Sequence, residues 1–277
     1  MCIRDSINAV VGGLLLLYGR GAENKMSRRD GYCVVTLSWV FFTFFGMLPF
    51  YFSGSIDTIT NAFFETMSGF TTTGATILDD IESLSHGMLF WRSLTQWIGG
   101  LGIVFFTIAI LPIFTTGGVQ LFSAESTGVT HDRTHPKINV MAKWLWTIYL
   151  VLTISETVLL MFGGMSLFDA ICQSFATTAT GGYSTKQNSI SYWNSPYIEY
   201  VVAIFMIVSS INFSLFLMCL KGKVGRLFKD EELHWFLASV GILTFLITLA
   251  LVFQNHYDWE TAFRKSLFQV CLLYTSD

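Results

Sequence analysis

The sequence predicts an all-α, polytopic membrane protein built from tandem repeats, and three observations lead to that fold class. The 277 residues are 52% hydrophobic and only 13% charged, whereas soluble proteins carry about a quarter charged residues. Several runs lack any charged residue over the roughly 20 positions that a membrane-crossing helix needs. Short amphipathic segments followed by threonine and glycine recur between those runs.

The runs without charged residues locate the expected membrane-crossing helices. They cover residues 31–56, 93–124, 200–220 and 235–255, together with 144–165, which is apolar except for Glu156. Residues 7–18 are apolar but short, and are interpreted as the inner part of a helix. We therefore expect helices near residues 7–19, 32–52, 88–113, 138–163, 197–220 and 234–254.

Lysine and arginine predict the orientation. Residues 20–30, 125–143 and 221–229 are basic, whereas 51–86 and 164–198 contain Lys186 as their only lysine or arginine. Basic connections remain in the cytoplasm. We therefore expect the connections that carry the threonine-glycine segments to face outward.

Three amphipathic segments, near residues 58–69, 167–177 and 259–269, are too short to cross a bilayer and are interpreted as half-helices. They align at an alanine and at a hydroxyl residue four positions later: Ala62 and Thr66, Ala170 and Ser174, Ala262 and Ser266. The first two continue into the pairs Thr73-Gly74 and Thr180-Gly181, which we match with each other. The predicted repeat is span, half-helix, loop and span.

The loops FTTTGAT (70–76) and ATTATGGYST (176–185) suit a cation. Irregular backbone survives at membrane depth only when it is buried in protein or lines a water-filled path. Carbonyl and hydroxyl oxygens are hard ligands, and glycine allows unusual backbone angles. Rings of carbonyls, one from each of four loops, replace the hydration shell of potassium. We therefore predict that both loops are selectivity-filter segments.

Four stretches together resemble the Trk/Ktr/HKT superfamily of potassium transporters, nearest its bacterial TrkH branch: MSGFTTTGAT, FWRSLTQWIGGLGIVFFTIAILP, QLFSAES and FATTATGGYST. Members fold four helix–pore-helix–helix repeats into a pseudo-fourfold pore like that of a potassium channel, so the resemblance implies that the pore is incomplete here. It implies these potassium-binding filter residues: Thr72, Thr73, Gly74, Ala179, Thr180 and Gly181, flanked by Ala75, Thr178 and Gly182. Related plant sodium transporters tend to have serine at the place of Gly74, so glycine favours potassium.

The resemblance also implies function and partners. It implies potassium uptake across the bacterial cytoplasmic (inner) membrane by the ion-conducting subunit of a Trk-type system. We expect no cofactor besides potassium as substrate, and the net charge of −3 is too small to indicate a nucleic-acid partner. It implies a homodimer when complete, with a cytosolic nucleotide-binding regulatory subunit (TrkA/KtrA-like) on the inner face. The basic residues 221–229 are compatible with such docking.

Three alternatives stay open. One is a sodium-permeable or sodium-coupled Ktr/HKT-like transporter. Another is an unrelated secondary transporter with broken helices, although those sites usually use inverted repeats, whereas the repeats here keep one orientation. The third is an intramembrane enzyme, which the near absence of His, Asp and Arg from the spans argues against; we find no catalytic constellation and expect no enzyme.

The expected organisation is a partial N-terminal helix and cytoplasmic loop (7–30), pore repeat 1 (31–124), a cytoplasmic connection with pore repeat 2 (125–229), and the start of pore repeat 3 (230–270). The ends MCIRDS (1–6) and CLLYTSD (271–277) are unlike the family and are expected to be foreign sequence. On that interpretation the third repeat is cut inside its half-helix. Two loops supply half of a four-loop ring, so the chain alone is not expected to conduct potassium selectively.

Other motifs have simpler interpretations. WIGGLG (97–102) lies in a charge-free span, so close helix packing through small residues is favoured over phosphate binding. Glu156 within a span is either functional or hydrogen-bonded inside the bundle. His131 and His135 have metal-ligand spacing but no third ligand, and are expected to be solvated. The five cysteines show no CxxC spacing, so no zinc site is indicated.

The acidic residues that follow the first loop, Asp79, Asp80 and Glu82, are open to two interpretations. They either concentrate cations at the mouth of a pore or form an ordinary solvated loop.

Overall fold

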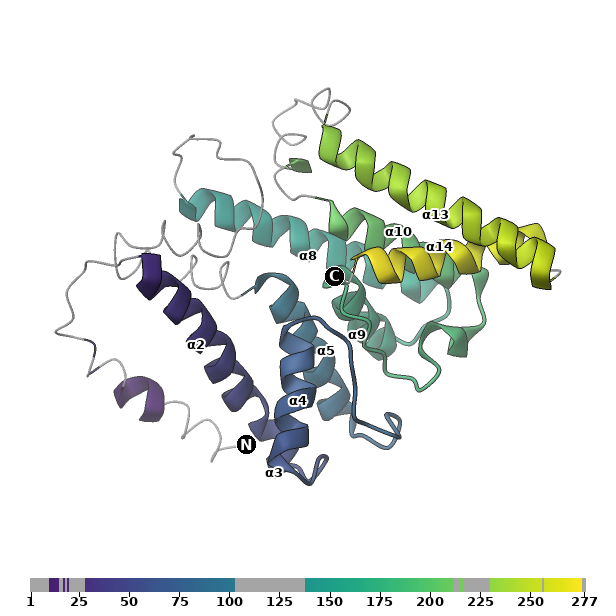
Figure 1. Cartoon of the computed structure of the whole chain (residues 1–277). Coiled ribbons are helices and arrows are strands. Elements are labelled where there is room, and N and C mark those ends of the chain that lie inside the picture. The colour runs from purple at the N-terminus through teal and green to yellow at the C-terminus, as the bar shows by residue number, and fades with distance from the viewer. Residues whose placement is uncertain are drawn as a thin grey trace.

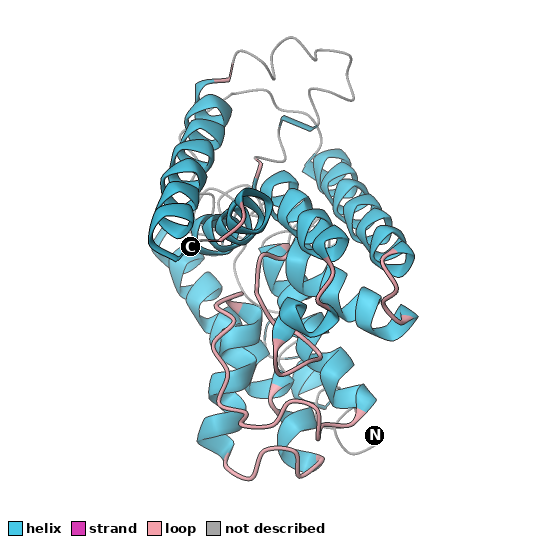
Figure 2. Cartoon of the chain, turned by 90° about the vertical axis from the view of Figure 1, so that its right-hand side faces the viewer, coloured by secondary structure: helices cyan, strands magenta, loops and turns pink. Residues whose placement is uncertain are grey.

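The regular structure of the chain is helical, as predicted. The computed structural model describes residues 10–14, 17, 19, 28–102, 138–211, 215–216, 230–255 and 257–275, and no strand occurs among them. Figure 2 shows these helices joined by irregular loops. Three successive groups, each with a long helix followed by a shorter one, make up most of the described part (Figure 1).

The first group contains α2 (Arg28–Gly46), α3 (Leu48–Phe52), α4 (Ile59–Phe70) and α5 (His86–Gly100). The single helix expected near residues 32–52 is broken at Met47, before the proline at the start of α3. Proline has no backbone N–H and is tolerated at the first turn of a helix but not in its interior. The break therefore coincides with the place where a new helix can begin.

The second group contains α8 (Ile138–Phe162), α9 (Leu167–Thr178), the 3₁₀ helix η2 (Ser189–Trp193) and α10 (Pro196–Ser210). Its half-helix begins as that of the first group does. The Thr58 hydroxyl accepts from the N–H of Asn61 at 3.3 Å, and the Ser166 hydroxyl accepts from the N–H of Asp169 at 3.1 Å. Such N-caps satisfy free N–H groups at a helix start. Both short helices were therefore correctly located by the sequence.

The third group contains α13 (Glu231–Asn255) and α14 (Trp259–Thr275). The sequence predicted a half-helix near 259–269, but α14 continues to Thr275. Residues 270–275 read VCLLYT, without the glycine or proline that usually ends a helix. Val270 and Cys271 are buried in the core beside α10. Apolar burial thus extends the helix beyond its predicted end.

The helices of successive groups interlock. Helix α5 packs on α9, and α10 packs on α14, so the last described helix of one group contacts the half-helix of the next (Figure 1). Within each group, α4 lies between α2 and α5, and α9 contacts α8 and α10. This order places the two loops that follow α4 and α9 next to the same helix, α5.

Long apolar helices agree with a membrane protein. Within the described part, Lys143–Phe162 and Glu231–Gln254 are long and apolar enough to cross a bilayer, while Thr36–Phe52 and Pro196–Ser210 are shorter apolar helices. Large side chains such as Ile154 and Phe245 are about 60% exposed, as expected for residues that face lipid. The parts of the predicted helices beyond residues 102 and 211 lie largely outside the described residues, as does most of 7–19.

Candidate functional site

The half-helices α4 and α9 each end directly at one of the threonine-glycine loops, here called loop 1 (residues 71–76) and loop 2 (residues 179–184). The C-cap residues are Thr71 for α4 and Ala179 for α9. The C-terminal end of a helix carries partial negative charge and stabilises a cation nearby. The structure confirms the prediction that the C-terminal ends of both half-helices meet the loops, and it shows no helix across the whole of 57–76.

The backbone angles fix how the two loops correspond. Left-handed φ angles occur at Thr72 and Gly74 (54° and 75°) in loop 1, and at Thr180 and Gly182 (54° and 79°) in loop 2. Gly74 therefore corresponds to Gly182, and the predicted match with Gly181 is wrong. The prediction aligned the two Thr-Gly dipeptides. In the structure, the residues that correspond are those at the same number of positions from the start of their half-helix.

The corrected correspondence shifts the second set of candidate residues by one position. Thr72, Thr73 and Gly74 correspond to Thr180, Gly181 and Gly182. The remaining predicted residues fall beside this set: Ala179 corresponds to the C-cap Thr71, Thr178 is the last residue of α9, and Ala75 corresponds to Tyr183. All nine candidates lie in loop 1, in loop 2 or at the end of α9.

The two loops touch at their glycines. A Cβ placed on Gly74 would collide with the carbonyl oxygen of Gly181 and would lie 3.8 Å from the Cα of Gly182. Side chains are therefore excluded where the loops meet, and the carbonyl oxygen of one loop faces the backbone of the other. Closely apposed irregular loops of this kind can contribute backbone carbonyl oxygens to a cation site.

Gln96 of α5 holds loop 2 from behind. Its Nε2 donates to the carbonyl oxygen of Gly181 at 2.6 Å, and its Oε1 accepts from the N–H of Tyr183 at 3.1 Å. A Cβ on Gly181 would lie 2.6 Å from both amide atoms of Gln96. A side chain at this position of loop 2 would therefore displace the buried amide of Gln96 from its two hydrogen bonds.

An ion pair lies behind loop 1. Arg92 Nε is 2.7 Å from Glu65 Oε1, and the two side chains are 2% and 0% exposed. The Glu65 carboxylate also accepts from the Thr76 hydroxyl and from the N–H of Ile77, both at 3.0 Å. Arg92 in turn donates to the carbonyl oxygen of Ser184 at 3.1 Å.

Small residues in α5 allow the half-helices to approach closely. A Cβ on Gly99 would collide with the carbonyl oxygen of Phe70, and one on Gly100 would lie 2.7 Å from the Cα of Ala179. Both contacts are with the C-terminal ends of half-helices. The interpretation of WIGGLG as a packing motif is therefore confirmed for its two central glycines.

Glu156 of α8 lies beside the second half-helix. It is fully buried, and its Oε2 is 3.4 Å from the hydroxyl of Thr178, whereas Oε1 has no hydrogen-bond partner in the described part. The contact with Thr178 agrees with hydrogen bonding inside the bundle. The position beside loop 2 agrees with a functional role, so both interpretations of Glu156 stay open.

The acidic residues after loop 1 are mostly engaged in local contacts. Asp80 accepts from the N–H groups of Glu82 and Ser83 at 3.1 and 3.3 Å. Glu82 pairs with Lys186 of the second connection at 3.4 Å. Asp79 is exposed. These contacts favour a structured loop and leave Asp79 as a surface charge.

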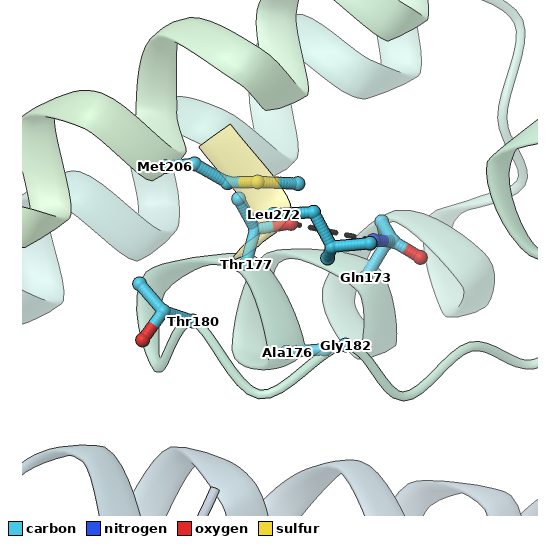
Figure 3. A pocket seen from close by; sticks show the side chains of 7 residues that line it. All are labelled: Gln173, Ala176, Thr177, Thr180, Gly182, Met206 and Leu272. Carbon is cyan, nitrogen blue, oxygen red and sulfur yellow. Dashed lines mark hydrogen bonds between the residues drawn. The ribbon is translucent and has the colours of Figure 1, made fainter. Parts of the chain in front are cut away.

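A small pocket lies on the flank of loop 2 between α9, α10 and α14. Its lining residues are Gln173, Ala176, Thr177, Thr180, Gly182, Met206 and Leu272 (Figure 3). Gln173 donates to the Thr177 hydroxyl at 3.3 Å, the dashed line of Figure 3, while its Oε1 lacks a partner in the described part. Gln173 occupies the position in α9 that Glu65 occupies in α4.

Four residues of this site were not predicted from the sequence: Glu65, Arg92, Gln96 and Tyr183. A signal for two of them was present. Glu65 and Arg92 are lone charges of opposite sign within otherwise apolar segments, and ionisable residues in such segments usually have a partner or a function. Other predictions, including those on His131, His135 and the basic residues 221–229, lie outside the described residues.

The long apolar helices and the two half-helices that end at irregular loops define an all-helical membrane protein. The chain belongs to the TrkH family, described as "Cation transport protein", whose model matches residues 2–262. The Trk system potassium uptake protein TrkH of Salmonella typhimurium is 41% identical over 270 residues, which are 96% of this chain and 56% of that protein. The Escherichia coli K12 protein of the same name matches equally.

A solved structure supports the same family. The crystal structure of the potassium transporter TrkH from Vibrio parahaemolyticus matches with a TM-score of 0.77 at 35% identity, and covers 92% of this chain and 52% of the solved one. The chain thus spans about half the length of the relatives that it matches. The predicted family and fold class are confirmed.

Proposed function

We propose that this chain supplies pore repeats of a bacterial potassium-uptake protein, with loop 1 and loop 2 as parts of its selectivity filter. The observation that carries the proposal is the contact between Gly74 and the carbonyl oxygen of Gly181, which brings two matching loops together at the C-terminal ends of two half-helices. The names of the relatives, which are potassium uptake proteins, support it.

The proposed potassium ligands are backbone carbonyl oxygens of Thr72, Thr73 and Gly74 and of Thr180, Gly181 and Gly182, the set that the backbone angles match; the oxygen of Gly181 also accepts from Gln96. Partial negative charge at the ends of α4 and α9 adds attraction for the cation. Potassium itself is the substrate, and the proposal needs no other cofactor. The repeats proposed are 31–124, 125–229 and 230–270.

The proposed setting follows the same argument. The protein crosses the bacterial cytoplasmic membrane several times with its filter loops outward, because the basic connections remain inside. A homodimer and a cytosolic nucleotide-binding regulatory subunit of the TrkA/KtrA kind are further parts of the proposal. Transport, rather than catalysis, is supported by the family to which the chain belongs.

The test is flux through a complete pore. Because the chain matches about half of its relatives, it would replace the matching half of the Vibrio parahaemolyticus transporter in a chimaera. Purified chimaera in liposomes should take up rubidium, a potassium substitute, in strong preference to sodium. Equal uptake of the two ions by a folded chimaera would contradict the proposal.

A further inference from the structure

We infer that the buried ion pair of Glu65 and Arg92 is a positioning device that sets cation selectivity by fixing loop 1 and loop 2 relative to each other. The inference rests on the proposed function of these loops as a filter, and it concerns residues that lie behind the filter and touch no ion. Glu65 is on α4 and Arg92 is on α5.

The carboxylate of Glu65 holds the exit of loop 1. One oxygen accepts from Arg92 Nε at 2.7 Å and from the Thr76 hydroxyl at 3.0 Å, and the other accepts from the N–H of Ile77 at 3.0 Å. Two of the three donors, Thr76 and Ile77, follow directly after Gly74 and Ala75 in the chain. The carboxylate therefore determines where the chain runs as it leaves the loop.

Arg92 carries the connection to loop 2. Its guanidinium lies 3.5 Å from the centroid of the Tyr183 ring and donates to the carbonyl oxygen of Ser184 at 3.1 Å. Tyr183 returns to the first half-helix, because its hydroxyl donates to the carbonyl oxygen of Glu65 at 2.9 Å. The contacts form a closed circuit from α4 through α5 and loop 2 back to α4, so neither loop can shift without disturbing the other.

Burial distinguishes this pair from a second ion pair, which joins the connections that follow loop 1 and loop 2. Glu82 and Lys186 also join the segments after loop 1 and loop 2, at 3.4 Å, but their side chains are 43% and 23% exposed. Exposed pairs are screened by water and salt and contribute little, whereas breaking a buried pair leaves an uncompensated charge. The chain thus provides its own matched control.

The second half-helix lacks this device. Gln173 stands at the position of Glu65, donates only to Thr177, and has an amide oxygen without a partner in the described part. Gln173 lines the pocket of Figure 3 and, as a neutral amide, forms no ion pair. Within the described part, the charged connection therefore belongs to the junction between the first and second repeats, and the two half-helices support their loops unequally.

Selectivity of the chimaera provides the functional test, with variants Glu65→Gln, Arg92→Gln, the double variant, and Glu82→Gln as control. We expect each single change at the buried pair to lower the rubidium-to-sodium flux ratio about tenfold, the size of one lost charge-assisted hydrogen bond. Glu82→Gln should leave the ratio within about twofold.

The double variant separates positioning from stability. Removing both charges should raise the thermal midpoint above that of either single variant, because no lone buried charge remains. The flux ratio should nevertheless stay low. The double variant lacks the carboxylate that accepts from Thr76 and Ile77 and the guanidinium that donates to Ser184. A flux ratio that recovers together with the midpoint would overturn the inference.

A measurement on the full chain decides the same question without transport. Hydrogen exchange of the purified chain should show faster exchange in Glu65→Gln at residues 74–78 and also at 181–185, while Glu82→Gln leaves both segments protected. Faster exchange confined to the first segment would overturn the inference even if flux is selective. If the unmodified chimaera shows no selectivity, the proposed function fails, and exchange alone then decides whether the two loops are coupled.

Discussion

Gly74 and Gly181 meet so closely that a Cβ on the first would collide with the carbonyl oxygen of the second. The contact joins two loops from different repeats and explains why glycine is needed in loop 1 for a reason beyond its φ of 75°. A left-handed φ is unfavourable for any residue with a side chain. A side chain at position 74 would in addition displace the carbonyl group of Gly181.

Gly74→Ser is expected to reduce selectivity, because its side chain pushes the carbonyl of Gly181 out of place. In the chimaera, the rubidium-to-sodium flux ratio should fall at least severalfold. Gly54→Ala is the control, since Gly54 also has a left-handed φ (68°) but no atom within 4 Å of its Cβ position. It should cost about 1 kcal/mol of stability from backbone strain and leave the ratio unchanged. An unaltered ratio in Gly74→Ser would count against the filter assignment.

Thr72→Val is expected to matter less than Gly74→Ser. Threonine and valine side chains have the same shape and branching, and the Thr72 hydroxyl makes no hydrogen bond within the described residues. If backbone carbonyls coordinate the ion, the flux ratio should remain within about threefold, less than one typical hydrogen bond is worth. A loss as large as that of Gly74→Ser would show that the hydroxyl itself is a ligand.

Gly100→Ala is expected to destabilise the chain, and Gly87→Ala to stabilise it, although both lie in α5. The new methyl at position 100 would lie 2.7 Å from the Cα of Ala179, whereas position 87 has open space. Overpacking costs about 1–3 kcal/mol, while replacing glycine by alanine in a helix gains roughly 0.5–1 kcal/mol. Thermal unfolding in detergent measures both. The same sign for the two variants would contradict the close packing.

Gln96→Leu is expected to cost more stability than Gln173→Leu. Both amides are buried, but Gln96 bonds two backbone groups of loop 2, whereas Gln173 bonds one hydroxyl and has an unpartnered oxygen. Leaving a buried polar group unpaired costs about 1–3 kcal/mol. The unfolding midpoint should therefore fall clearly for Gln96→Leu and little for Gln173→Leu, and equal losses would refute this difference.

Local patterns predicted the half-helices well. The segments expected near residues 58–69 and 167–177 are helices at Ile59–Phe70 and Leu167–Thr178. The same patterns misjudged α14, because its continuation to Thr275 depends on burial against α10. They also matched Gly74 with Gly181, because a shared dipeptide was a stronger signal in the sequence than the distance from each cap.

The residues behind the loops could not be found from local patterns. Arg92 reaches Ser184, and Tyr183 reaches Glu65, across 92 and 118 positions of the chain. No periodicity or motif encodes such a pairing. The lone charges of Glu65 and Arg92 in apolar segments were the available signal, and they indicate that a partner exists without identifying it.

The interlocking of α5 with α9 and of α10 with α14 has a consequence for synthesis of the protein. The last described helix of one group contacts the half-helix of the next, so these contacts can form only after the later half-helix has been synthesised. Tyr183 is made 118 residues after Glu65, which takes roughly 6–24 seconds at typical ribosome speeds of about 5–20 residues per second. During that interval loop 1 lacks the contacts that it later makes with loop 2, so its final arrangement is reached only after the second half-helix and its loop have been synthesised.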